Sequence, residues 1–162
     1  MFVYSIRAST VKFFAFIMLT LALLVGAVVF GGGDAVLASG SAAEVDFDGI
    51  KTADDRIAFI KSFGIEIDGE SCEEAAFTMP DNFDRVILGY NELQKKQGLD
   101  LSKYAKKKVT RYSYRVTNWN SDGEVYASLF IYRGKVIACD VSSADPEGFV
   151  LPLTLIEKSN LK

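Results

Sequence analysis

The stretch that decides the fold is residues 109–142, which read VTRYSYRVTNWNSDGEVYASLFIYRGKVIACDVS. It is rich in β-branched and aromatic residues, which favour strands, and short polar segments divide it into three runs. We therefore predict strands over residues 109–118, 124–132 and 135–142. Arg133-Gly134 lies between the last two runs and predicts a two-residue hairpin loop. Three consecutive antiparallel strands of this kind form a β-meander.

The hairpin loop also predicts a register for the last two strands. With a two-residue loop, Ile131 lies opposite Val136 and Phe130 lies opposite Ile137. Continuing down the ladder, Ser128 lies opposite Cys139.

Two helices are predicted upstream of the meander. Residues 52–63 combine a threonine cap, an aspartate three residues later and apolar residues at helical spacing. Residues 81–97 carry a stronger apolar stripe, with Asp81 or Asn82 as the cap and Gly98 as the stop. Shorter extended segments are predicted at residues 65–67, 74–79 and 149–155. Helices followed by a β-meander predict an α+β domain with both helices on one face of an antiparallel sheet.

The N-terminal part predicts a membrane segment. Residues 13–30 read FFAFIMLTLALLVGAVVF, without a charge, and a helix of about 18–20 residues spans the hydrocarbon core of a bilayer. Arg7 and Lys12 precede this stretch, so the positive-inside rule keeps the N-terminus in the cytoplasm and sends the rest across. A cleaved signal peptide, which would release a secreted domain, is the alternative, because small residues follow at residues 36–43.

These observations divide the chain into five parts. We predict a cytoplasmic N-terminus at 1–10, a transmembrane helix or uncleaved signal anchor at 11–30 and a flexible spacer at 31–51. An exported α+β domain follows at 52–155, with a C-terminal tail at 156–162.

The composition excludes several classes of function. The chain has no histidine, which removes the commonest general base and the commonest transition-metal ligand. Its net charge of −3 argues against a nucleic-acid partner, for which a basic domain is expected. No motif in the sequence indicates a catalytic site, a metal site or a cofactor. We therefore expect a protein that is not an enzyme and needs no cofactor.

The two cysteines, Cys72 and Cys139, leave two alternatives open. Outside the cytoplasm they could form one disulfide, which would stabilise the domain by about 3–4 kcal/mol. The alternative is a pair of free thiols, with Cys139 as a core residue of its strand.

Charge is unevenly distributed along the chain. Acidic residues outnumber basic ones over residues 44–74, and basic residues outnumber acidic ones over residues 95–115. The basic stretch is a candidate patch for an anionic envelope polymer or for lipid headgroups, which it would attract by long-range electrostatics. The alternatives are a solvated surface and pairing with the acidic half. The patch consists of Lys103, Lys106, Lys107, Lys108, Arg111 and Arg115.

Four segments of the sequence resemble a known family. They are RIAFIKSFGIEI at residues 56–67, MPDNFD at 79–84, YNELQKKQG at 90–98 and RYSY at 111–114. Together they are similar to an uncharacterised Gram-positive bacterial family of unknown function. The resemblance implies one N-terminal membrane segment joined to a small exported domain, and it implies no activity.

Three hypotheses for the function follow. The first is a non-enzymatic, membrane-tethered module of the cell envelope that binds an anionic polymer. The second is an envelope hydrolase that uses two carboxylates about 5–10 Å apart. The third is an accessory subunit that docks on a membrane protein through the apolar segment. The candidate carboxylates of the second hypothesis are Asp81, Asp84, Asp122 and Asp140.

Overall fold

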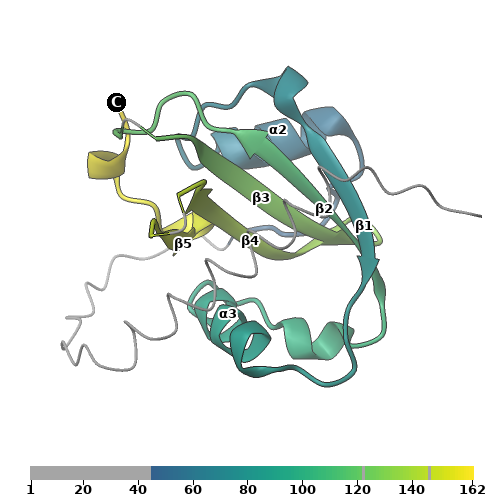
Figure 1. The fold of residues 1–162 in the computed structure, drawn as a ribbon. Helices are drawn as coiled ribbons and strands as arrows, with labels where there is room; N and C mark the ends of the chain where they lie inside the picture. The colour runs from purple at the N-terminus through teal and green to yellow at the C-terminus, as the bar shows by residue number, and fades with distance from the viewer. Residues whose placement is uncertain (1–44, 122, 146) are drawn as a thin grey trace, which may run out of the picture.

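A computed structural model describes residues 45–121, 123–145 and 147–162. Its centre is one antiparallel sheet in which the strands lie in chain order, β1-β2-β3-β4-β5 (Figure 1). The predicted α+β class and the central β-meander are therefore confirmed. The strands are β1 Glu73–Thr78, β2 Lys108–Arg115, β3 Val125–Tyr132, β4 Lys135–Ser143 and β5 Val150–Pro152.

Two α-helices accompany the sheet, α2 at Ala53–Lys61 and α3 at Arg85–Lys95. Thr52 caps α2 in a full capping box with Asp55, as its sequence predicts. Among the described residues, no helix is long and apolar enough to cross a membrane. The predicted span at residues 11–30 lies outside the described residues.

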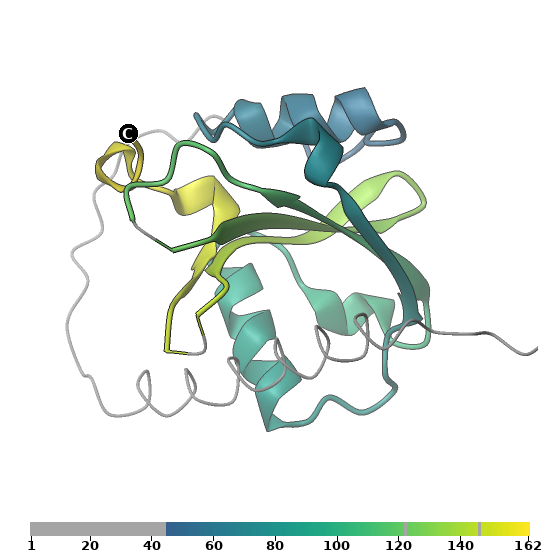
Figure 2. The same ribbon diagram turned by 45° about the horizontal axis from the view of Figure 1, so that its top comes forward.

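The two helices lie on opposite faces of the sheet, so the prediction that they share one face is wrong (Figure 2). Leu129 and Phe130 are neighbours on β3, and their side chains therefore point to opposite faces. Leu129 packs in one core cluster with Phe59 of α2. Phe130 lies 5.7 Å from the ring of Tyr90 in α3, measured between ring centroids. Both faces carry apolar residues, so each needs its own cover; we call them the α2 face and the α3 face.

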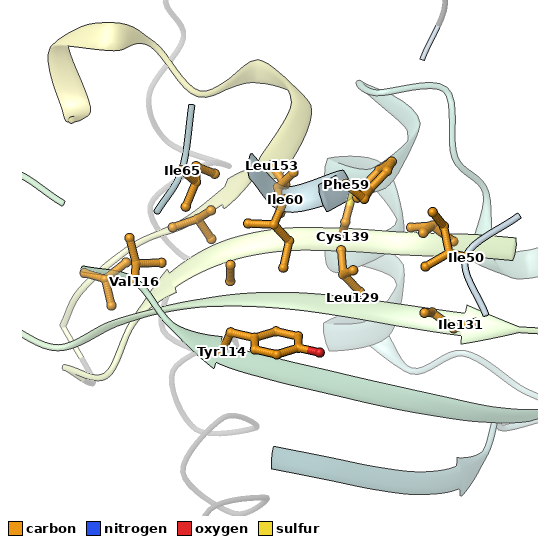
Figure 3. Close-up of a cluster of buried hydrophobic side chains, with 14 of the residues drawn as sticks. Ile50, Phe59, Ile60, Ile65, Tyr114, Val116, Leu129, Ile131, Cys139 and Leu153 are labelled. Carbon is orange, nitrogen blue, oxygen red and sulfur yellow. The ribbon is translucent and has the colours of Figure 1, made fainter. Parts of the chain in front are cut away.

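The larger core cluster lies between the α2 face and α2. Figure 3 shows Phe59 and Ile60 above Leu129 and Cys139 of the central strands. Ile60, Leu129 and Cys139 are fully buried. Since each fully buried large apolar side chain contributes about 1.5–3 kcal/mol, this cluster is the main source of stability for α2.

Arg56 adds a polar contact between α2 and the sheet. Its Nε donates a hydrogen bond of 2.9 Å to Tyr114 Oη. Its guanidinium also lies 3.7 Å from the centroid of the Tyr112 ring, a cation–π contact. The two tyrosines of β2 that face α2 therefore orient the helix as well as fill the core.

A β-bulge changes the predicted register of the hairpin. Ile131 pairs with Val136 as expected, but Phe130 pairs with Ala138 instead of Ile137. Ile137 is the extra residue, so every later pair shifts by one position. As a result Cys139 points to the α2 face, whereas the next residue, Asp140, points to the α3 face.

The start of α3 also differs from the prediction. The helix begins at Arg85 with Asp84 as its cap, whose side chain accepts a hydrogen bond from the backbone N–H of Ile87. Neither of the expected caps, Asp81 or Asn82, serves, and Asp81 forms an ion pair of 2.8 Å with Lys106. All three carboxyl or amide residues near this end suit a cap chemically, and in the structure Asp84 serves while Asp81 pairs with Lys106.

The folded unit extends beyond the predicted boundaries 52–155 at both ends. In the predicted spacer, Phe47 accepts a hydrogen bond of 2.8 Å from the backbone N–H of Val136, and Ile50 is 9% exposed. In the predicted tail, Leu161 forms a bridge with Trp119. Both segments therefore belong to the same unit as the sheet.

Candidate functional site: a basic end and a buried polar cluster

The lysines of the predicted patch gather where the chain enters β2. Lys103 lies in the short 3₁₀ helix at Leu101–Tyr104, and Lys106, Lys107 and Lys108 follow after Ala105. All four are exposed, and we call them the basic end. Lys106 has a φ of 61°, in the left-handed region that non-glycine residues rarely adopt.

Among the described residues, the one ion pair of the basic end joins Lys106 to Asp81. Asp100 lies nearby, and its pKa is lowered to about 2 by hydrogen bonds from Asn91 and Ser102, with a smaller effect from Lys103. Asp100 is therefore ionised at neutral pH. Even with these two carboxylates the basic end has a net positive charge.

The two arginines of the predicted patch do not join the basic end. Arg111 is only 5% exposed and lies on the α3 face of β2. Arg115 lies at the far end of β2 and forms an ion pair of 2.7 Å with Asp68. Arg111 and Arg115 share one face of β2, where Arg111 is buried, and the length of the strand separates Arg115 from Lys108.

Arg111 instead belongs to a buried polar cluster under α3. Tyr90 Oη donates a hydrogen bond of 2.6 Å to Asp140 Oδ2, and Asp140 is 5% exposed. On the same face of the sheet, Ser113 Oγ and Ser128 Oγ lie 2.9 Å apart. The register places Ser113, Ser128 and Asp140 side by side across β2, β3 and β4.

Burial shifts the titration of this cluster. It raises the pKa of Asp140 to about 6, against the opposing effects of the Tyr90 hydrogen bond and the Arg111 charge. Burial and the neighbouring Asp140 raise the pKa of Tyr90 well above its usual value. Desolvation lowers the pKa of Arg111, while Asp140 acts in the opposite direction. The charged side chains Asp140 and Arg111 are therefore held inside the fold, where a large ligand cannot reach them.

Two glutamines at the end of α3 complete the buried polar region. Gln94 Oε1 accepts a hydrogen bond of 3.0 Å from the backbone N–H of Cys139, and Gln97 Nε2 donates one of 2.6 Å to the Cys139 carbonyl. Gln97 Oε1 also accepts from the backbone N–H of Thr154 at 3.2 Å. The short β5 leaves this part of β4 without a strand partner, so the two amides satisfy its backbone.

Cys72 and Cys139 are free thiols, Cys72 exposed and Cys139 buried, so the alternative of a disulfide is not what the structure shows. Cys72 directly precedes β1, and three strand spacings of about 4.8 Å separate β1 from β4. A disulfide requires Cα atoms within about 7 Å. Burial is the main cause of the raised pKa of Cys139.

The candidate carboxylates take separate structural roles. Asp81 is exposed and paired with Lys106, Asp84 caps α3, and Asp140 is buried with Tyr90. Asp122 lies outside the described residues. Among the described residues, no group of three or more acidic or cysteine side chains is placed to hold a metal ion.

Sequence reasoning missed the hydrogen bond of Tyr90 to Asp140 and the burial of Gln94 and Gln97. The sequence held a partial signal of this polar region. Arg111 and Ser113 are two positions apart, so they share a face of their strand, and the same holds for Ser128 and Phe130. These polar side chains lie in the interior only because α3 covers their face of the sheet.

The fold and these features define a small α+β domain with an exposed basic end and a closed polar interior. The chain belongs to the family described as Domain of unknown function (DUF4830), whose model matches residues 59–141, just over half of the chain. This confirms the resemblance to a family of unknown function. The match runs from α2 to β4 and includes the basic end and the buried cluster. No curated protein and no solved structure matches the chain significantly.

Proposed function

We propose that the chain is a non-enzymatic binding module of the cell envelope, held at the membrane by its N-terminal segment, and that its basic end binds an anionic polymer. The observation that carries the proposal is the basic end itself. Its four lysines lie in one short stretch, all are exposed, and one ion pair offsets them among the described residues. Flexible, strongly hydrated ammonium groups suit a repeating anion whose charges need no fixed geometry.

The length of the N-terminal part supports a role close to the membrane. If residues 13–30 anchor the chain, residues 31–44 separate the anchor from the folded unit. At about 3.5 Å per residue they reach at most about 50 Å. Anionic polymers attached to the envelope, or lipid headgroups, lie within that distance.

The test compares charge reversals at the basic end with reversals elsewhere. The Lys103→Glu, Lys107→Glu double variant is compared with a Lys61→Glu, Lys158→Glu control, in which both lysines are also exposed. Retention on an immobilised phosphate-containing wall polymer is measured at 50 and 300 mM salt. We expect the first variant to lose binding by tenfold or more, and the wild type and the control to bind in a salt-dependent manner. Equal binding by both variants, or wild-type binding that ignores salt, contradicts the proposal.

A further inference from the structure

Strand β1 forms an open edge of the sheet. It pairs with β2 on one side, and no described strand lies on its other side (Figure 1). Met79, just after the end of β1, directs its backbone N–H and C=O groups toward the β2 side. Its N–H donates a hydrogen bond to the Lys107 carbonyl, and its carbonyl accepts one from the Lys106 N–H, each at 2.9 Å. In an antiparallel ladder this direction alternates along the strand. Glu74, Ala76 and Thr78 therefore direct their backbone N–H and C=O groups outward.

The outward residues are accessible. Glu74, Ala76 and Thr78 are all exposed, and no hydrogen bond joins them to a described residue outside the pairing with β2. Natural edge strands are usually protected by proline, by charged side chains, most often lysine, or by a bulge. The charges of β1, EEAAFT, are confined to the glutamates at its first two positions; the strand has neither proline nor lysine, and its ladder with β2 is regular.

The charges around β1 are polarised along the strand. Glu73 and Glu74 lie at its beginning, with Glu70 just before them. Lys106, Lys107 and Lys108 lie beside its other end, where Lys108 pairs with Thr78. A second β1 running antiparallel would bring its acidic end to this basic end, and by symmetry the same contact would form twice.

We propose that β1 pairs with β1 of a second copy of this chain, antiparallel and centred on Ala76, so that the two sheets become one. Ala76 then faces the partner's Ala76, and Glu74 and Thr78 exchange hydrogen bonds with the partner's Thr78 and Glu74. Small side chains at the centre allow close approach of the backbones. Pro80 has no N–H, so it ends the ladder beyond Thr78.

The register brings one pair of opposite charges closer between copies than within one copy. Side chains directly opposite each other share a face, so the partner's Glu74 joins the row of Thr78 and Lys108 on the α2 face, two strand spacings or about 10 Å from Lys108. Within one copy Glu74 and Thr78 are four positions apart on β1, which separates Glu74 from Lys108 by about 14 Å. Any energetic coupling between Glu74 and Lys108 therefore reports contact between copies.

Cross-linking tests the centre of the interface. The full chain, solubilised in a mild detergent, carries Cys72→Ser together with either Ala76→Cys or, as a control, Ala58→Cys on the exposed side of α2. Mild oxidation should give a disulfide-linked dimer with Ala76→Cys, at several times the yield of the control, because opposed residues of a ladder have Cα atoms about 5.5 Å apart. Equal yields from the two variants overturn the proposal.

A charge swap tests the register. By sedimentation equilibrium of the full chain, Glu74→Lys should weaken the dimer by about 3- to 30-fold, and adding Lys108→Glu should restore it. A monomeric wild type at about 100 μM, or no recovery in the double variant, overturns the proposal. The Glu74→Lys variant keeps the basic end and should still be retained on the polymer, so loss of dimerisation and loss of polymer binding are distinguishable.

Discussion

Tyr90 Oη donates a hydrogen bond of 2.6 Å to Asp140 Oδ2 and so joins the middle of α3 to strand β4. The contact is enclosed, because Asp140 is 5% exposed and Arg111, on the same face of the sheet, is equally buried. Together with the hydrogen bonds of Gln94 and Gln97 to the Cys139 backbone, this contact fixes α3 on the sheet.

Removal of that donor should destabilise the domain. Tyr90→Phe keeps the ring contact with Phe130 but leaves a buried carboxylate oxygen without its hydrogen bond. We expect the free energy of unfolding to fall by about 1.5–3 kcal/mol at pH 7.5. Urea unfolding measures it through Trp119, the one tryptophan of the chain, which is buried and stacked on Phe149. Tyr132→Phe is the control, and an equal effect of both variants would contradict the special role of Tyr90.

Asp140 should also make stability depend on pH. Its pKa is raised by burial from 3.8 to about 6 in the folded state, against the effects of Tyr90 and Arg111. A group whose pKa is raised by folding stabilises the fold at pH below 3.8, and this contribution is lost as the pH rises through 6. The loss amounts to at most about 3 kcal/mol.

The comparison with Asp140→Asn isolates this contribution. Relative to that variant, the wild type should become less stable between pH 4 and pH 7 in the urea assay. Parallel pH profiles of the two proteins would show that Asp140 does not titrate in this range.

Replacement of Gln97 should lower the free energy of unfolding more than replacement of an exposed residue. Gln97→Ala leaves the Cys139 carbonyl and the Thr154 N–H without their partner. We expect a loss of about 2–3 kcal/mol of unfolding free energy. Lys96→Ala, an exposed neighbour at the same helix end, should change it by less than about 0.5 kcal/mol. The difference in urea midpoint between the two variants is the measurement.

The β3–β4 turn offers a stabilising substitution. Arg133 and Gly134 have φ values of 51° and 80°, and the turn requires positive φ at both positions. Arg133→Asn should raise the stability by about 0.5–1 kcal/mol, because asparagine tolerates this region better than arginine. Gly134→Ala should lower it, because its Cβ would also lie 3.2 Å from Lys51 Cγ. Thermal melting of both variants shows whether each substitution raises or lowers the stability. A lower melting temperature for Arg133→Asn would contradict the expected gain.

The thiols should differ in reactivity. Cys72 is exposed, whereas Cys139 is fully buried and has a raised pKa. Alkylation of the folded protein should therefore add one label, and alkylation in urea should add two. A protein that takes no label in urea unless it is first reduced would instead contain the disulfide.

Local signals in the sequence predicted much of the fold. The capping box of Thr52 and Asp55 predicted the start of α2, since its contacts span three residues. The runs of β-branched and aromatic residues predicted β2, β3 and β4 in the right order. Each of these features depends on neighbours in the chain.

The predictions from the sequence were wrong where contacts between distant segments determine the structure. Asp81, Asn82 and Asp84 can all cap a helix, and in the fold Asp84 is the cap while Asp81 pairs with Lys106. The bulge at Ile137 has no mark in the sequence, yet it determines which face Asp140 occupies. The placement of α3 opposite α2 then buried Arg111, which the sequence had grouped with exposed lysines.

The sequence by itself therefore determined the α+β class, the meander and the exposed basic end, because periodicity, turns and charge runs act over a few residues. Only the tertiary structure decided that the helices cover opposite faces, that a charged cluster is enclosed between β4 and α3, and that β1 is an open edge. Those features arise from contacts between segments 50 or more residues apart, such as Tyr90 with Asp140, whose energies depend on burial and on register.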